Sequence, residues 1–166
     1  MTFEDLQTLL EYHYWARDRV LDAAAAISPQ KYTEDLGSSF PSIRDTLAHT
    51  YTAEWIWHAR WQGVSPPAPL PFDQFPDVAS LRSAWMELER RNRAFLATLG
   101  EPGIMRTFDY RTLSGLAGSS PFWQMLQHVV NHASYHRGQV TSMLRQVGAQ
   151  PGKNMDMITF YRERRA

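Results

Sequence analysis

Apolar residues recur with helical periodicity along four long stretches of the chain. We therefore predict helices over about residues 3–27, 43–62, 78–99 and 121–147. The predicted ends carry recognisable signals, which are the N-cap candidates Thr2, Ser42 and Asp77 and the C-terminal glycines Gly63, Gly100 and Gly148. Four long amphipathic helices indicate an all-α protein, a four-helix bundle, in a single domain of 166 residues.

The connections between the predicted helices differ in kind. Ser28-Pro29 ends the first helix and leads into a loop over residues 32–40. Residues 64–76 hold five prolines, which predict a long, stiff connection between the second and third helices that runs along the bundle instead of turning tightly. Residues 103–120 alternate large and polar side chains, so we expect a short β-hairpin or an extended flap there.

Particular residues also mark the C-terminal third of the chain. Ser119 and Ser120 precede Pro121, which we place at the first position of the fourth helix. Gly138 interrupts that helix at a cost of roughly 1 kcal/mol relative to alanine, so we expect close packing or an approaching ligand there. Residues 155–161 predict a short terminal helix that covers one end of the bundle.

Three of the six histidines lie at four-residue intervals in the fourth helix, at His128, His132 and His136. On an α-helix such residues share one face, with neighbouring side chains about 6 Å apart. That spacing allows two imidazoles to bind one metal ion, and the alternative is a buried histidine ladder joined by hydrogen bonds. Three histidines in register, with Gln139 on the same stripe, favour metal binding. Helix geometry alone does not decide which adjacent pair binds.

The remaining histidines lie in the first two helices. His49 occupies a face of small and apolar residues that suits the interior of a bundle. His58 is about half a turn out of phase with His49, so we expect it at the surface. His13 lies within the apolar stripe of the first helix, beside Arg17, and we predict a structural or pocket-lining role for it instead of metal binding. Arg17 and Arg137 are candidates to pair with a substrate carboxylate, but we interpret both as surface salt-bridging residues.

A histidine pair on one helix and His49 on another would give a metal ion three neutral imidazoles. Such a site keeps coordination positions open for water or substrate, which is typical of catalytic sites. An ion held this way lowers the pKa of a bound water to about 7 or stabilises a bound thiol as thiolate. The chain has no cysteine, so protein ligands are limited to His, Asp, Glu and the backbone. Imidazole suits Zn, Ni, Cu or Fe, and we favour Zn or Ni, with Fe or Mn as alternatives.

Composition narrows the possible partners. Acidic and basic residues balance at 17 each, so we expect neither nucleic acid nor an anionic membrane surface as a partner. No apolar run approaches the roughly 20 residues that span a bilayer. The acidic N-terminus lacks the positive region of a secretory signal. We therefore expect a cytoplasmic protein that acts on a small molecule.

Several motifs occur together along the chain. They are Leu47-Ala48-His49 with Ala53-Glu54, the block Asn131-His132-x-x-x-His136-Arg137-Gly138-Gln139, the helix end from Leu144 to Gly148, and Asp156-Met157-Ile158. Over essentially the whole chain they resemble the DinB family, the damage-inducible-type bundle proteins also described as DinB/YfiT-like metalloenzymes. The resemblance implies a metal-binding triad of His49, His132 and His136. It makes His128 a neighbour of the triad, and it predicts a smaller amide where this chain has His13.

The resemblance also bears on function. Family members commonly form homodimers, and some relatives are thiol-dependent S-transferases or isomerases that use low-molecular-weight thiols. We therefore expect a metal-dependent enzyme whose triad activates a thiol or water for S-transfer or hydrolysis of a small molecule. Glu54 lies about 140° round its helix from His49 and offers no general base at the triad, which favours thiol transfer. The alternative is a non-catalytic, metal-binding dimeric bundle that acts as a stress-related or interaction protein.

Overall fold

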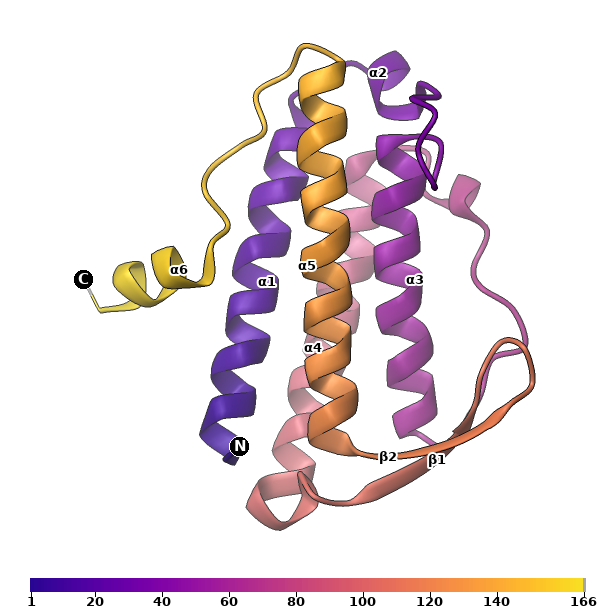
Figure 1. Ribbon diagram of the computed structural model, residues 1–166, viewed down its shortest axis with the longest axis vertical. Coiled ribbons are helices and arrows are strands. Elements are labelled where there is room, and N and C mark those ends of the chain that lie inside the picture. The colour runs from indigo at the N-terminus through magenta and orange to yellow at the C-terminus, as the bar shows by residue number, and fades with distance from the viewer. Residues whose placement is uncertain (166) are drawn as a thin grey trace.

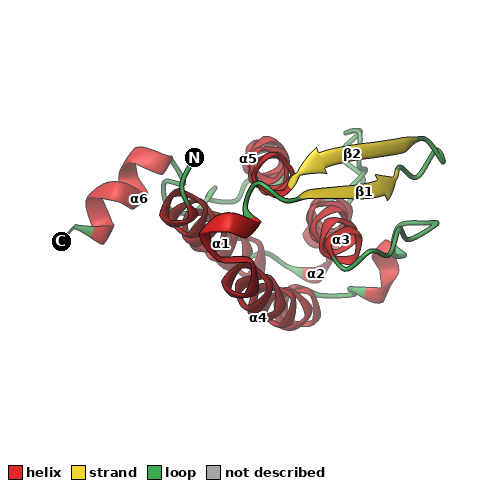
Figure 2. Ribbon diagram, turned by 90° about the horizontal axis from the view of Figure 1, so that it is seen from below, coloured by secondary structure: helices red, strands yellow, loops and turns green. Residues whose placement is uncertain are grey.

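The computed structural model describes residues 1–165. Four long helices lie side by side in it (Figure 1): α1 (Phe3–Ala25), α3 (Ile43–Trp61), α4 (Val78–Gly103) and α5 (Phe122–Gln146). Seen from below in Figure 2, they form a ring in the order α1, α5, α3 and α4. The expected mostly helical architecture is confirmed, and a small two-stranded sheet is added to it.

The smaller elements connect or flank these helices. They are α2 (Pro29–Thr33), the 3-10 helix η1 (Phe72–Gln74), β1 (Thr107–Arg111), β2 (Ala117–Pro121) and α6 (Met157–Arg164). The strands pair antiparallel from Thr107 opposite Pro121 to Arg111 opposite Ala117, which confirms the predicted hairpin. The proline-rich connection carries η1 and passes along the outer side of α3, as predicted (Figure 1).

Side-chain caps begin the first three long helices where the sequence predicts them. The hydroxyl of Thr2 accepts a hydrogen bond from the Asp5 amide, and the Asp5 carboxylate accepts one from the Thr2 amide, which completes a capping box. Ser42 and Asp77 accept backbone hydrogen bonds in the same way at α3 and α4. Asp45 does not return the bond to Ser42 and pairs with the neighbouring arginine side chain.

Two predicted helix boundaries are wrong because the residues there form hydrogen bonds in a different helix or in a strand. Ser28 caps a new helix, α2, with Pro29 at its first position, so residues 32 and 33 are helical although we predict a loop from residue 32. At the start of α5, the pairing of β2 with β1 extends to Pro121, so that proline is the N-cap and not the first helical residue. The preceding Ser119 lies in the strand, and its hydroxyl donates to Asp109.

The end of α4 and the position of α6 also differ from expectation, but by less. Gly100 adopts a positive φ of 58°, and the chain re-enters a helical turn beyond it, so this glycine forms a kink before the end of α4. Helix α6 begins at Met157 and lies against α1 (Figure 1), whereas the sequence analysis places it over one end of the bundle. No helix in the described part of the chain is both long enough and apolar enough to cross a membrane.

Helix α5 packs against both α1 and α3, and this position brings the residues of the candidate site together. Its buried face includes Leu126, Val140 and Leu144, each at most 1% exposed. On α3, Leu47 is equally buried and belongs to the same core cluster. Because these apolar residues fix the facing sides of α3 and α5, the polar residues on the same sides are brought together.

Candidate metal centre

Three histidines meet where α3 and α5 face each other. His49 comes from α3, and His132 and His136 come from adjacent turns of α5. Their ligand nitrogens all lie within 4.8 Å of one another, and the group could hold a metal ion. Nε2 of His132 is 3.2 Å from Nε2 of His49 and 3.1 Å from Nε2 of His136. We call these three residues the histidine triad.

Hydrogen bonds among neutral imidazoles do not account for both short contacts. Nδ1 of His136 lies 2.7 Å from Oε1 of Gln139. The proton of a neutral His136 is therefore on Nδ1, and its Nε2 carries a lone pair. Nε2 of His132 can donate to His136 or accept from His49, but one nitrogen cannot do both. One of the two contacts is left without a hydrogen bond, and a cation bound by three lone pairs removes that conflict.

The nitrogen separations also fit an ion. Two nitrogens at 2.0–2.1 Å from a tetrahedral zinc stand about 3.3 Å apart. The observed separations of 3.1 and 3.2 Å are close to that value. The hydrogen bond from His136 to Gln139 is the kind of outer contact that fixes the tautomer and ring orientation of a metal-binding histidine.

The surroundings of the triad favour its neutral, metal-binding form. Burial and, to a lesser extent, the nearby His136 together lower the pKa of His49 to about 4. Burial and the neighbouring histidines together lower the pKa of His132 to about 3. The pKa of His136 is lowered by burial, although the bond to Gln139 opposes the shift. At pH 7 all three imidazoles are therefore available as ligands.

Two aromatic side chains cover the triad and were missed by the sequence analysis. Phe40, from the loop before α3, stacks on His49 with ring centroids 4.0 Å apart and also contacts His136 edge-on at 5.6 Å. Phe72, from η1, packs edge-on against Phe40 at 5.9 Å and lies 6.5 Å from His49. Both come from irregular segments without periodicity, so no sequence signal points to them.

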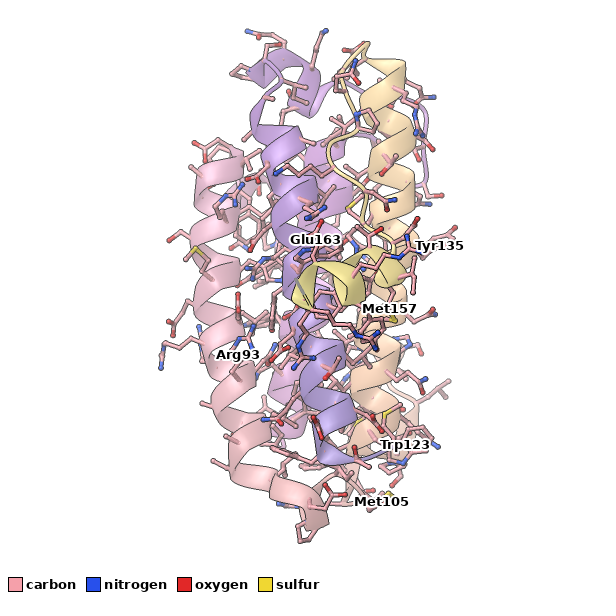
Figure 3. The ribbon with its side chains drawn as sticks, turned by 90° about the vertical axis from the view of Figure 1, so that its left-hand side faces the viewer. Arg93, Met105, Trp123, Tyr135, Met157 and Glu163 are labelled. Atoms are coloured by element: carbon pink, nitrogen blue, oxygen red, sulfur yellow. The ribbon has the colours of Figure 1, made fainter. Side chains whose placement is uncertain are left out.

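A cavity of about 420 Å³ lies next to Gln139, the residue bonded to His136, although no triad residue lines it. Gln139, which holds His136, is one of its walls, and Leu36 and Met143 supply apolar surface. Tyr135 lies at the edge and projects from α5 into solvent (Figure 3), with 65% of its surface exposed. The cavity is large enough for a small molecule.

The structure separates the other histidines from the triad. His128 is exposed and packs edge-on against Trp57 at 5.2 Å, outside the group of converging nitrogens. His13 is fully buried in α1 and makes its hydrogen bond to Glu54, which agrees with the structural role predicted for it. His58 is half-buried and bonds through Nδ1 to Asn92 at 2.7 Å, so its predicted surface location is wrong.

Glu54 is the centre of a second buried polar cluster, on the other side of α3. Its carboxylate accepts hydrogen bonds from side chains of α1 and α4, which are His13, Tyr14, Trp85 and Asn92. Burial by itself would raise the pKa of Glu54, but the charge of His13 and these hydrogen bonds together lower it. We call these five residues the Glu54 cluster. A lone glutamate on a helix carries no sequence signal for such a role.

The surface location predicted for two arginines is wrong. Arg17 and Arg137 are not surface residues, since they are 2% and 4% exposed. Arg17 pairs with Asp18 and Glu89, side chains that helix packing brings around it. Of the two explanations for Gly138, close packing is wrong, because a Cβ built on it would meet no atom within 4 Å, and the approach of a ligand stays a prediction.

Comparison with known proteins gives consistent results. The model of the DinB family matches residues 1–164. The chain is 28% identical to Protein DinB of Bacillus subtilis (strain 168), with 84% of each chain covered. It also resembles the crystal structure of a DinB-like protein from Bacillus cereus ATCC 10987, with a TM-score of 0.69 and 18% identity, over 92% of this chain and 97% of that one. At this identity, the structural likeness shows a common fold.

Proposed function

The chain belongs to the DinB family, and from this premise and the histidine triad we propose that it is a metal-dependent enzyme acting on a small molecule. His49, His132 and His136 bind one divalent ion within a four-helix bundle of the DinB/YfiT-like type. The observation that carries the proposal is the convergence of three neutral Nε2 atoms, two of them 3.1 and 3.2 Å from the third. Ligand type favours zinc or nickel, with iron or manganese as alternatives.

The reaction we propose is S-transfer from a low-molecular-weight thiol, with hydrolysis as the second possibility. When bound, the ion supplies Lewis acidity that favours the deprotonated form of a thiol or of water. The protein supplies the rest. Gln139 orients His136, Phe40 and Phe72 keep bulk water from one side of the triad, and the cavity next to Gln139 receives the small molecule.

The lack of a carboxylate favours a thiol over water as nucleophile. In the described residues, no Asp or Glu belongs to the triad group, and Glu54 is already bonded to four donors elsewhere. Hydrolysis gains from a general base that takes a proton from water. In S-transfer, the sulfur bonds to an electrophilic carbon, the bond to the leaving group breaks, and the thiol proton goes to solvent. A thiol needs less help from a base because its pKa is lower.

Metal analysis of three proteins tests the binding step. Metal is quantified in the untagged wild type, in His132→Ala and in His128→Ala. We expect the triad variant to lose its metal. His128→Ala, which removes an exposed histidine one turn away on the same helix, should retain it. Equal loading in all three proteins would exclude the triad as the binding site.

Turnover tests the catalytic step. The metal-loaded wild type is assayed with cysteine as the thiol and an aryl halide as the electrophile, and separately with ester substrates. We expect thiol conjugation that His132→Ala abolishes and His128→Ala retains. Metal that binds to the triad and stabilises the protein without turnover in either screen would favour the alternative, a non-catalytic metal-binding dimer with a stress-related or interaction role.

A further inference from the structure

A second cavity lies on the opposite side of α5 from the triad, between α5, α1 and the segment that leads into α6. Its volume is about 670 Å³. Figure 3 shows the start of α6, marked by Met157, lying over the seam between α1 and α5. Tyr12 of α1 and Arg137 of α5 line the cavity, and residues 151–157 close it from outside. None of the triad residues belongs to it.

Arg137 is buried against this cavity, and no carboxylate among residues 1–165 is in direct contact with it. Its side chain donates through Nη2 to the hydroxyl of Ser134 at 2.7 Å, and the same nitrogen is 3.5 Å from the hydroxyl of Tyr12. Both partners are neutral. Over residues 1–165, no carboxylate oxygen lies within 4.0 Å of the guanidinium, and Nε and Nη1 donate no hydrogen bond. Because Arg137 lines the cavity, we take these donors to be available to a ligand that enters it.

The other buried arginine shows what this site lacks. Arg17 is 2% exposed, and two carboxylates, Asp18 and Glu89, lie 2.8 and 2.7 Å from its Nη2. Taking a guanidinium out of water is unfavourable unless an anion compensates for the lost hydration. Arg17 has such an anion in direct contact, whereas Arg137, at 4% exposure, has none among the described residues.

The rim of the cavity adds positive charge. Arg145 and Lys153 line it, both are exposed, and Asp156 is the one acidic side chain among the lining residues. Two cations at the mouth and one at depth outnumber this carboxylate. The resulting field attracts anions in a chain whose formal net charge is zero.

We propose that this cavity binds a small anion that carries a carboxylate or phosphate group. Arg137 receives the anionic group at depth, because its planar fork of N–H donors matches the oxygens of either group. Arg145 and Lys153 hold the remainder of the molecule near the mouth. The cavity falls within the size range of small-molecule sites. The site is separate from the triad and does not rest on the function proposed above.

Anion binding to matched variants tests the proposal. Inorganic phosphate and succinate are titrated into the metal-loaded wild type at constant ionic strength, with chloride as the reference, and heat of binding gives Kd. We expect one or both anions to bind in preference to chloride. The anion that binds identifies the group that the site takes. Arg137→Met removes the charge at similar length and should raise Kd about tenfold to a hundredfold.

Two controls locate the binding. Arg93→Met removes an exposed arginine of α4, far from the cavity (Figure 3), and should leave Kd unchanged. His132→Ala removes a triad ligand and should also leave it unchanged, since the anion does not bind to the metal. Failure of both anions to bind better than chloride would overturn the proposal. Wild-type affinity in Arg137→Met, or loss of binding in His132→Ala, would do the same.

A rim variant keeps the test independent of the folding of Arg137→Met. Arg145→Glu with Lys153→Glu reverses two exposed charges and leaves Arg137 in place. This double variant should also bind phosphate or succinate at least about tenfold more weakly than the wild type, because like charge at the mouth repels the anion. An unchanged Kd in this variant contradicts the proposed site.

Discussion

Helix α3 carries two buried polar clusters whose hydrogen bonding differs in one decisive respect. The carboxylate of Glu54 accepts four hydrogen bonds of 2.6–2.8 Å from side chains of α1 and α4, and these bonds join both helices to α3. His49, five residues earlier, joins α3 to α5 in a group of lone pairs that no hydrogen-bond pattern satisfies. The carboxylate of Glu54 finds all four of its donors within the chain, although Nδ1 of His13 is buried without a hydrogen-bond partner. The triad, in contrast, becomes complete with a cation.

This difference suggests how to tell a structural cluster from a binding site. A buried polar group that finds all its partners in the fold contributes to the uniqueness of the packing. One that lacks a compatible partner is explained by a ligand. If this contrast is correct, changes to the Glu54 cluster affect stability and leave metal affinity alone. Changes to the triad and its supports affect metal affinity first.

The largest effect is expected from Glu54→Ala. Removing the carboxylate leaves the buried donors of His13, Trp85 and Asn92 without their acceptor, and we expect a loss of about 3–5 kcal/mol in the free energy of unfolding. Urea denaturation measures it. Glu87→Ala, an exposed glutamate of α4, is the control and should change stability by about 0.5 kcal/mol or less. If Glu54→Ala proves as stable as Glu87→Ala, the Glu54 cluster does not hold the helices together.

Removing the metal should have the next largest effect. At free metal concentrations of 100 to 1,000 times Kd, a ligand that binds only the folded state stabilises it by about 2.7–4.1 kcal/mol. A chelator should therefore lower the free energy of unfolding of the wild type by that amount. His132→Ala should show no response to the chelator, because it has no triad to load. An equal melting temperature of the wild type with and without chelator would contradict the claim that the triad is completed by a metal ion.

Gln139→Ala acts on the triad indirectly, by removing the hydrogen-bond partner of His136. Without the acceptor at 2.7 Å, the His136 ring loses both its fixed tautomer and its orientation. We expect metal Kd to rise tenfold to a hundredfold, about 1.4–2.8 kcal/mol. Competition with a chromophoric chelator measures Kd. Gln124→Ala, on the exposed face of the same helix, should bind metal like the wild type.

The smallest effect concerns pH and the metal-free protein. The pKa values of His49 and His132 are lowered to about 4 and about 3, below the 6.5 of an unfolded histidine. Between those values the unfolded chain binds more protons, so stability falls as pH drops through 6.5. Because both rings are partly exposed, we expect a loss of about 1 kcal/mol between pH 8 and pH 5. Urea denaturation of the chelated wild type measures it, and chelated His132→Ala should lose less.

Regular elements were largely predictable from the sequence because their signals are local. The caps at Thr2, Ser42 and Asp77 depend on residues three positions apart, and the apolar stripes repeat every turn. The start of α5 was misplaced for the opposite reason. Pro121 pairs in the sheet with Thr107, which lies fourteen positions away in the chain.

The candidate site divides in the same way. The i, i+4 spacing places His128, His132 and His136 on one helical face with Gln139, but it leaves open which adjacent pair binds a metal. The apolar face of its helix predicts an interior position for His49, and the family resemblance selects His132 and His136 as its partners. The cover by Phe40 and Phe72 and the four partners of Glu54 have no counterpart in the sequence. The same holds for the lack, within residues 1–165, of a carboxylate in contact with Arg137.

The sequence by itself determined which residues share a helical face, because backbone hydrogen bonding fixes side-chain direction within each helix. Only the tertiary structure decided which faces meet. Burial of apolar surface sets the ring order α1, α5, α3 and α4, and that order places His49 against α5 and Glu54 against α1 and α4. Which buried polar groups find partners, and which await a ligand, is a consequence of that packing.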